Sequence, residues 1–135
     1  MKIILSLATA LLFTLSALAM DSQPMELSFS PGLAQAQVDQ VYSYSFGTTR
    51  VGFPLYTDFT LTNRGVVNLA VNSVGIGGID FDAYHTCPAV LAPAAVCTIR
   101  VRFNPWNEGF KTGRVVIQTS DGMIRINLSG WAQRY

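Results

Sequence analysis

Hydrophobic and polar residues alternate along most of the chain from residue 42 onward. The segment 97–103 shows this most clearly, because Thr98, Arg100 and Arg102 lie between apolar side chains. A period of two is typical of a β-strand with one face buried and the other in water. The segments 55–63 and 123–130 have the same period. The pattern therefore predicts an apolar core that includes Leu55, Phe59, Leu61, Cys97, Ile99, Val101, Phe103, Ile124, Ile126 and Leu128.

Turn signals separate the alternating segments. Ser30-Pro31-Gly32 follows the short segment 25–29, Asn63-Arg64-Gly65 follows another, and Asp121-Gly122 predicts a β-hairpin. The polar, alanine-rich segment 33–40 fits either a loop or one helical turn. Six to eight short strands with such turns predict an all-β sandwich.

The first 19 residues have the composition of an export signal. Lys2 precedes an apolar run from Ile3 to about Ala17, and Ala17-Leu18-Ala19 has small residues where a signal peptidase cleaves. The alternative is a retained anchor, but the run is short for a span of about 20 residues. We therefore expect a signal peptide at 1–19, and a periplasmic or extracellular bacterial protein after cleavage.

The mature chain is expected to carry no net charge. The full sequence has nine Lys and Arg against eight Asp and Glu, and cleavage would remove Lys2, which leaves eight of each. Balanced, scattered charges lack the electrostatic footprint of a nucleic-acid-binding protein. We find no second apolar run long enough to span a membrane, so we expect no integral span in the mature chain.

The order of the turn and loop residues resembles that of a known family. Phe46-Gly47 and Val51-Gly52 come first, then LTNRG at 61–65, two cysteines around a Pro/Ala loop, FNPWNEG at 103–109 and LSG at 128–130. This order resembles the Hydin-like (ASH) immunoglobulin-like domains, above all the bacterial choice-of-anchor D type. The resemblance implies a seven-stranded Greek-key β-sandwich and a non-catalytic interaction role. On this basis we expect an N-terminal strand and linker at 20–41, the immunoglobulin-like domain at 42–131 and a C-terminal tail at 132–135.

Two features depart from the family pattern. Bacterial relatives often carry the domain in large surface proteins with a C-terminal sorting signal, whereas this sequence ends at Gln133-Arg134-Tyr135. Pro93-Ala94-Ala95 stands where many relatives have a glycine turn. The second difference is expected to change only the shape of the loop.

The segment 85–97 holds His85, Cys87 and Cys97, which are the chain's one histidine and both of its cysteines. A zinc site needs three or four close ligands, and a nine-residue gap between cysteines is not the short spacing of zinc knuckles. A cysteine nucleophile needs a free thiolate beside a base, which a second cysteine within reach would consume. In an exported chain two cysteines favour a disulfide. We therefore predict a Cys87–Cys97 disulfide, an exposed His85, and no metal or cofactor.

Several aromatic and basic residues are candidates for an interaction surface. Tyrosine, tryptophan and arginine are over-represented among interface anchors. Arg114 and Arg125 are expected to lie beside Arg100 and Arg102 on one sheet face, either as a patch for an acidic partner or as an ordinary solvated face. Separately, Asp80 and Asp82 are too few for a calcium site and are expected to be solvated at a strand edge. The alternative for the aromatic residues is that some of them fill the ends of the sandwich, with Trp106 covering the core from a turn. The candidate surface comprises Tyr42, Tyr44, Tyr56, Arg100, Arg102, Trp106, Phe110 and Trp131.

The sequence as a whole predicts an exported, non-catalytic module that binds a protein, or a glycan, at the cell envelope. The alternative is a structural subunit of an envelope or appendage assembly that is joined by strand addition. In that case Met25–Phe29 would be a donor strand for a neighbouring subunit rather than the domain's own first strand. A remote alternative is a metal carrier or an enzyme that uses His85, Cys87 and Cys97.

Overall fold

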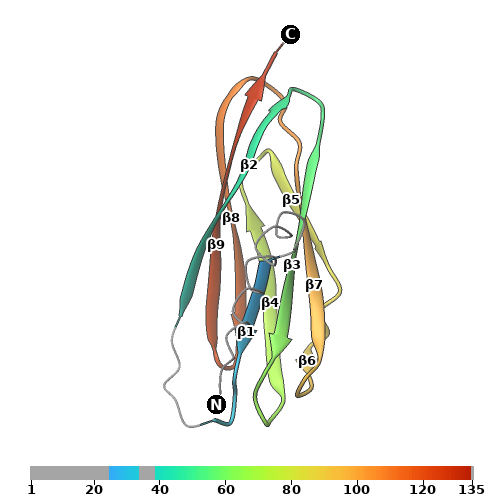
Figure 1. Cartoon of the computed structure of the whole chain (residues 1–135), viewed down its shortest axis with the longest axis vertical. Helices are drawn as coiled ribbons and strands as arrows, with labels where there is room; N and C mark the ends of the chain where they lie inside the picture. The colour runs from blue at the N-terminus through green and yellow to red at the C-terminus, as the bar shows by residue number, and fades with distance from the viewer. Residues whose placement is uncertain (1–24, 34–38, 135) are drawn as a thin grey trace, which may run out of the picture.

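The computed structural model describes residues 25–33 and 39–134, and all regular elements in these ranges are strands (Figure 1). The predicted signal peptide lies outside the described residues, as does most of the segment expected to be a loop or a helical turn. The part of the chain that is described contains no helix with the length and apolar character needed to cross a membrane. The strands are β1 (Met25–Phe29), β2 (Gln40–Arg50), β3 (Leu55–Asn63), β4 (Leu69–Gly77), β5 (Phe81–His85), β6 (Val90–Leu91), β7 (Val96–Phe103), β8 (Gly109–Thr119) and β9 (Gly122–Gln133).

The strands form two sheets that face each other. Sheet A has the order β1-β3-β7-β5, and sheet B has the order β2-β9-β8-β4-β6. From β3 to β8 each strand lies in the opposite sheet from the one before it, and β8 and β9 form a hairpin within sheet B. This is the connectivity of a Greek-key immunoglobulin-like sandwich, as the family resemblance implied.

The described residues contain nine strands rather than the seven that the resemblance implied. Two features account for the difference. The N-terminal part of the sandwich is divided between the sheets, because β1 pairs in parallel with β3 whereas β2 pairs in parallel with β9. In addition, the two-residue strand β6 pairs with the start of β4.

The sandwich is also longer than the predicted domain at 42–131. Strand β1 belongs to it, since Leu27 is fully buried and Phe29 nearly so. Strand β2 already begins at Gln40, and β9 continues to Gln133. The segment Met25–Phe29 therefore completes one edge of sheet A in its own chain.

The core lies between the sheets and follows the predicted alternation. Ile99, Val101 and Phe103 of β7 are fully buried, and Ile124 and Ile126 of β9 are fully buried opposite them. Aromatic rings pack together in the core beside the start of β5 and the end of β7, where Phe81 stacks on Phe103 with ring centroids 4.9 Å apart. A β-carbon at Gly130 would lie 2.4 Å from the Phe103 ring, so this close approach requires glycine.

Candidate functional site

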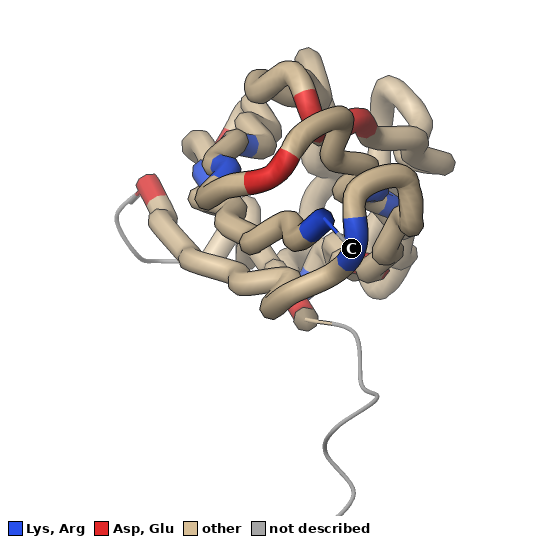
Figure 2. Tube along the Cα trace, turned by 90° about the horizontal axis from the view of Figure 1, so that it is seen from above, with Lys and Arg blue, Asp and Glu red and all other residues tan. Residues whose placement is uncertain are grey.

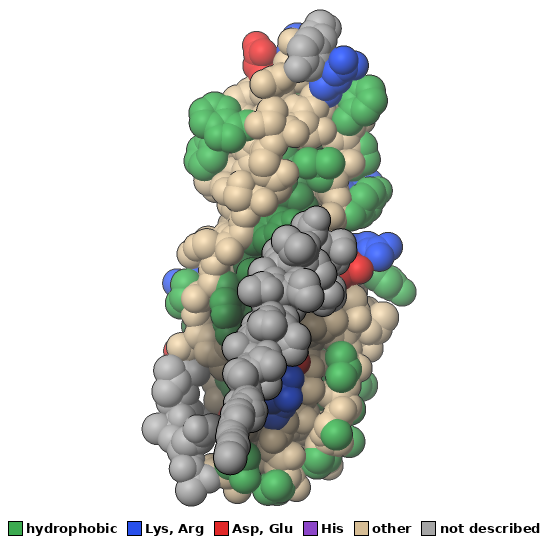
Figure 3. Space-filling view, viewed as in Figure 1, with side chains coloured by type: hydrophobic (Ala, Val, Ile, Leu, Met, Phe, Trp, Pro, Cys, Tyr) green, Lys and Arg blue, Asp and Glu red, His purple; other side chains and the backbone are tan. Residues whose placement is uncertain are grey.

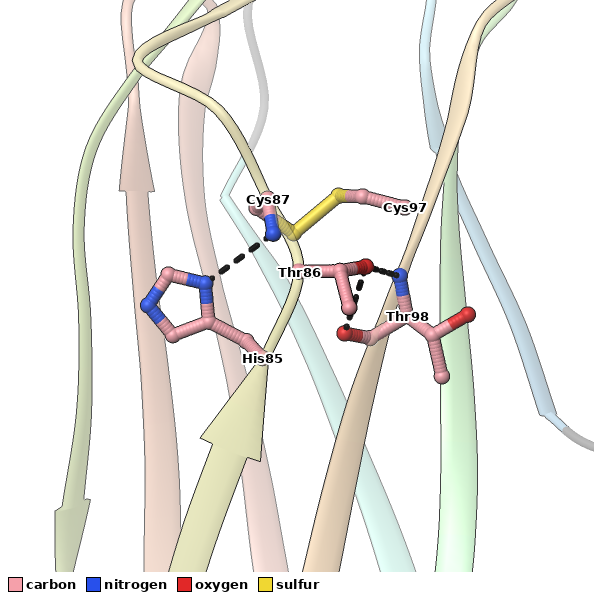
Figure 4. The surroundings of a disulfide bond; sticks show 5 residues. All are labelled: His85, Thr86, Cys87, Cys97 and Thr98. Atoms are coloured by element: carbon pink, nitrogen blue, oxygen red, sulfur yellow. Dashed lines mark hydrogen bonds between the residues drawn. A yellow bond between two sulfur atoms is a disulfide. The ribbon is translucent and has the colours of Figure 1, made fainter.

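The Cys87–Cys97 disulfide is formed, with the two Cα atoms 4.9 Å apart (Figure 4). The β5–β7 pairing continues beyond its last strand pair, because the Thr86 N–H donates a hydrogen bond to the Thr98 carbonyl oxygen at 3.0 Å. The disulfide joins the next pair of residues along the same two segments. His85 is exposed, as predicted, and its Nδ1 accepts a hydrogen bond from the Cys87 N–H at 3.1 Å. The disulfide therefore closes the loop that contains β6 and leaves neither thiol available as a nucleophile or metal ligand. Within the described ranges, no three side chains of His, Cys, Asp or Glu are grouped closely enough to hold a metal ion.

Three connecting loops meet at the end of the sandwich opposite this disulfide. Leu55, Phe81 and Phe103 share one register row at the ends of β3, β5 and β7. The loops that adjoin this row, 51–54, 78–80 and 104–108, therefore lie at the same end, where β9 also finishes. Figure 2 looks down onto this end and shows the connecting loops side by side.

Backbone hydrogen bonds join the three loops to one another. The Gly52 N–H donates to the Pro105 carbonyl oxygen at 3.0 Å, and the Asn104 N–H donates to the Asp80 carbonyl oxygen at 2.8 Å. The Val51 N–H donates to the Gln133 carbonyl oxygen at 2.9 Å, which attaches the first loop to the end of β9. The loops are therefore fixed in place rather than independent.

The side chain of Asp80 lies at the centre of this arrangement. It is nearly buried, in contrast to the predicted solvated strand edge. Its Oδ1 accepts a hydrogen bond from the Trp106 N–H at 3.2 Å, and its Oδ2 lies 3.9 Å from the Lys111 Nζ. Asp80 thereby connects the 78–80 loop to the 104–108 loop and to β8.

Large apolar side chains project into solvent from these loops and from the adjoining strand ends. Ile79 is 92% exposed and Trp106 77% exposed, while Phe53 is about half exposed. Phe110 and Trp131 are also about half exposed, and their rings pack together with centroids 4.9 Å apart. Figure 3 shows hydrophobic side chains protruding at this upper end. We call this surface the aromatic end; it comprises Phe53, Ile79, Trp106, Phe110 and Trp131.

The structure places three of the predicted surface residues, Trp106, Phe110 and Trp131, at the same end of the sandwich, and the Phe110 and Trp131 rings are in contact. It does not place Tyr42 and Tyr44 with them, because both tyrosines are partly buried against the core. On β2 they share the inward phase with Phe46, and the Tyr44 ring contacts the Phe46 and Phe59 rings edge to face. Tyr42 keeps its hydroxyl hydrogen-bonded to the Gln40 Oε1 at 2.6 Å, which allows an inward position.

The predicted alignment of four arginines is wrong. Arg100 and Arg102 lie on β7 of sheet A, whereas Arg114 and Arg125 lie on β8 and β9 of sheet B. Arg100 makes two hydrogen bonds to the Asp58 carboxylate, at 2.8 and 3.0 Å, and Arg102 pairs with Asp82. Tyr56 is exposed beside Arg102 on the outer face of sheet A.

Sequence reasoning missed Phe53 and Ile79 at this end, and it placed Asp80 at a solvated strand edge instead of in a nearly buried position. An exposed apolar residue in a tight loop is the signal that was available, since Phe53 lies between Gly52 and Pro54 and Ile79 follows two glycines. Phe53 also has the Arg50 guanidinium 5.6 Å from its ring centroid, within the range of a cation–π contact.

Comparison with solved structures finds similar folds. A secreted serine protease of Vibrio cholerae, VesC, aligns with a TM-score of 0.53 at 20% identity over 65% of this chain and 21% of VesC. The ASH/PapD-like domain 7 of human CEP192 aligns with a TM-score of 0.49 at 17% identity, over 71% of this chain and 84% of that domain. The V. cholerae protease VesB aligns with a TM-score of 0.49 at 19% identity, over 70% of this chain and 30% of VesB.

The chain thus spans about a fifth of the length of VesC, and at this identity the similarity concerns the fold alone. No family model matches the sequence, and no curated protein is similar to it. The fold is an immunoglobulin-like β-sandwich.

Replacing Asp80 by alanine is expected to lower the free energy of unfolding by about 1–3 kcal/mol, because it leaves the Trp106 N–H without its partner at a nearly buried site. Chemical denaturation measures this loss, and the intrinsic fluorescence of Trp106 should change with it. Asp82→Ala is the matched control, since it removes an exposed carboxylate whose pair with Arg102 contributes at most about 1 kcal/mol. Equal losses in the two variants would contradict the role given to Asp80.

The ion pair on sheet A predicts a small dependence of stability on pH. The hydrogen bond from Arg100 lowers the pKa of Asp58 below its ordinary value of 3.8, against the opposing effect of burial. Since the folded state has the lower pKa, the ionised carboxylate stabilises the fold above pH 3.8, and this contribution is lost as the pH falls through the folded pKa.

The variant Asp58→Asn should therefore be less stable than the wild type at neutral pH, by no more than about 1 kcal/mol. This difference should disappear once the carboxyl group is protonated. Denaturation at neutral and strongly acidic pH measures both values, and a difference that persists in strong acid would contradict the ion-pair explanation.

Proposed function

We propose that this protein is an exported, non-catalytic immunoglobulin-like module that binds a protein partner at the bacterial cell envelope through its aromatic end. The partner would lie across the three joined loops and the Phe110–Trp131 pair. The resemblance to choice-of-anchor D domains belongs to the same proposal, because those domains are also interaction modules.

The observation that carries the proposal is the exposure of five large apolar side chains at one end of the sandwich. Tryptophan and other aromatic residues dominate the energetics of protein interfaces, since they bury much apolar area on rigid side chains. An exposed apolar patch costs solubility unless a partner covers it, so such a patch marks an interaction site. The hydrogen bonds between the loops add to the argument, because a surface that is already ordered loses less entropy on binding.

The disulfide supports the proposed location. Structural disulfides form and persist in oxidising compartments and are rare in the cytosol. Together with the signal peptide expected at 1–19, the Cys87–Cys97 bond favours the periplasm or the extracellular space.

A crosslinking pull-down from native cell envelopes, followed by mass spectrometry, tests the proposal. The bait is the tagged protein, compared with the double variant Trp106→Ala/Trp131→Ala. Tyr84→Ala is the matched control, because Tyr84 is equally exposed but lies on the outer face of sheet A. We expect the wild type and the control to retain the same protein and the double variant to lose it while keeping its thermal unfolding transition. Equal retention by all three would contradict the proposal.

A further inference from the structure

Charge is divided unequally between the two sheets. Sheet A contains three acidic residues on its strands, Glu26, Asp58 and Asp82. The five strands of sheet B contain none, although they carry Arg50, Lys111, Arg114 and Arg125. Lys111 lies on the inward phase of β8 beside Asp80, whereas Arg50, Arg114 and Arg125 lie on the outward phase. The outer face of sheet B therefore carries three basic strand residues and no acidic one.

A hollow of about 580 Å³ crosses this outer face. It follows one register row across four strands, in which Ser43 pairs with Asn127, Asn127 with Arg114, and Arg114 with Gly77. The next row adds Ser129 and Thr112. The outward positions of these rows are glycine, serine and threonine together with Arg114 and Asn127, whereas the next row upward carries the bulkier Phe110–Trp131 pair. We call it the sheet B groove.

Arg114 in the sheet B groove has no acidic partner among the described residues. The arginines on the strands of sheet A, Arg100 and Arg102, are both paired with a carboxylate. Arg125 lies diagonally beside Arg114 on β9, and its Nε is buried without a hydrogen-bond partner in the described part of the chain. Sheet B therefore presents the exposed Arg114 guanidinium, which forms no ion pair with the described residues and can pair with an anionic ligand.

The shape and lining of the sheet B groove select the class of ligand. The groove runs across the strands, so an added β-strand, which would lie parallel to them, does not fit it. Its lining consists of three hydroxyl groups, one amide, one guanidinium and three glycines, and Leu128 is the one apolar side chain among the lining residues. Such a lining matches a ligand that has many hydroxyl groups and a carboxylate, with an aromatic wall one row away for the apolar face of a sugar ring.

We propose that the sheet B groove binds an acidic saccharide. The carboxylate of a uronic acid residue meets the Arg114 guanidinium, and the sugar hydroxyls hydrogen-bond to Asn127, Ser129 and Thr112. The proposal does not depend on a protein partner at the aromatic end, because Arg114 and Gly77, the central residues of the groove, lie outside that surface. The two surfaces share only the Phe110–Trp131 pair, which borders the groove.

A titration of the ¹⁵N-labelled protein, followed through its amide and arginine side-chain NMR signals, tests the proposal with three probes. Tetragalacturonate is the acidic saccharide, its methyl ester is the matched neutral saccharide, and hexaglutamate is an acidic peptide. We expect tetragalacturonate to shift the signals of Ser43, Gly77, Thr112, Arg114 and Asn127, and the other two probes to leave them unchanged. Equal binding of the methyl ester or of hexaglutamate at these residues would overturn the assignment, as would shifts elsewhere or none at all.

Two variants locate the binding site. Arg114→Gln removes the charge and should weaken tetragalacturonate binding about ten-fold or more. Gly77→Glu should block the groove without strain, because a β-carbon there would approach nothing closer than the Arg114 carbonyl oxygen at 4.0 Å. Arg64→Gln is the control, since it makes the same change in charge at an exposed site paired with Glu26 on the other sheet. Unchanged affinity in both groove variants, or an equal loss in the control, would overturn the proposal.

Discussion

Replacing Asn63 by alanine is expected to lower the free energy of unfolding by about 3 kcal/mol, at about 1 kcal/mol for each of three hydrogen bonds. Asn63 is fully buried at the end of β3. Its Nδ2 donates to the Val67 and Leu91 carbonyl oxygens, both at 2.9 Å, and its Oδ1 accepts from the Gly65 N–H at 2.8 Å. One side chain therefore ties β3, the loop after it and β6 together. Alanine removes the partner of all three backbone groups, and it leaves the Leu91 carbonyl oxygen unsatisfied in a buried position.

Urea denaturation of the wild type and the variant measures this loss. Asn68→Ala provides the matched control, because Asn68 lies in the same loop and is exposed. We expect the control to stay within about 0.5 kcal/mol of the wild type. A loss below about 1 kcal/mol for Asn63→Ala would show that the three backbone groups find other partners, which would contradict the role given to this side chain.

Removing the disulfide is expected to lower the free energy of unfolding by about 2.8 kcal/mol, the chain-entropy value for a closed loop of eleven residues. The bond spans a sequence separation of ten and joins the end of β5 to β7. Without it, the unfolded chain gains the freedom that the loop closure removed. The double variant Cys87→Ala/Cys97→Ala, measured by denaturation, gives the value directly.

Reduction of the wild type with a thiol reagent is the control for this prediction. It breaks the same bond without changing the side chains, so the reduced wild type should lose about as much stability as the double variant. A loss in the variant that far exceeds the loss on reduction would show that packing around buried Cys97, rather than loop closure, is the main contribution.

The faces of the strands could be predicted from the sequence because alternation is a local property. The inward positions of β7 and β9 follow directly from it. Tyr42 and Tyr44 were misassigned because a tyrosine can bury its ring and still hydrogen-bond its hydroxyl, so its polar character does not fix its face. Ala94 has a φ of 70°, in the left-handed region that favours glycine, so the residue type at this position does not predict the turn.

The assembly of the site could be predicted only in part because it depends on contacts between distant segments. Trp106 and Trp131 were recognised by residue type, but Phe53 and Ile79 join them through pairings such as Gly52 with Pro105 and Asn104 with Asp80. Likewise, alternation does not show which sheet a strand joins. That choice separates Arg114 from Arg100 and gives the two sheets their different charges.

Site-specific photocrosslinking in intact cells tests the central claim most directly. A benzophenone amino acid in place of Trp106 probes the aromatic end, and the same amino acid in place of Tyr84 probes an equally exposed position on the outer face of sheet A. We predict a discrete crosslinked species of higher mass, containing one partner protein, from position 106 and none from position 84. The same species from both positions, or none from position 106, would contradict the assignment of the aromatic end as the interaction surface.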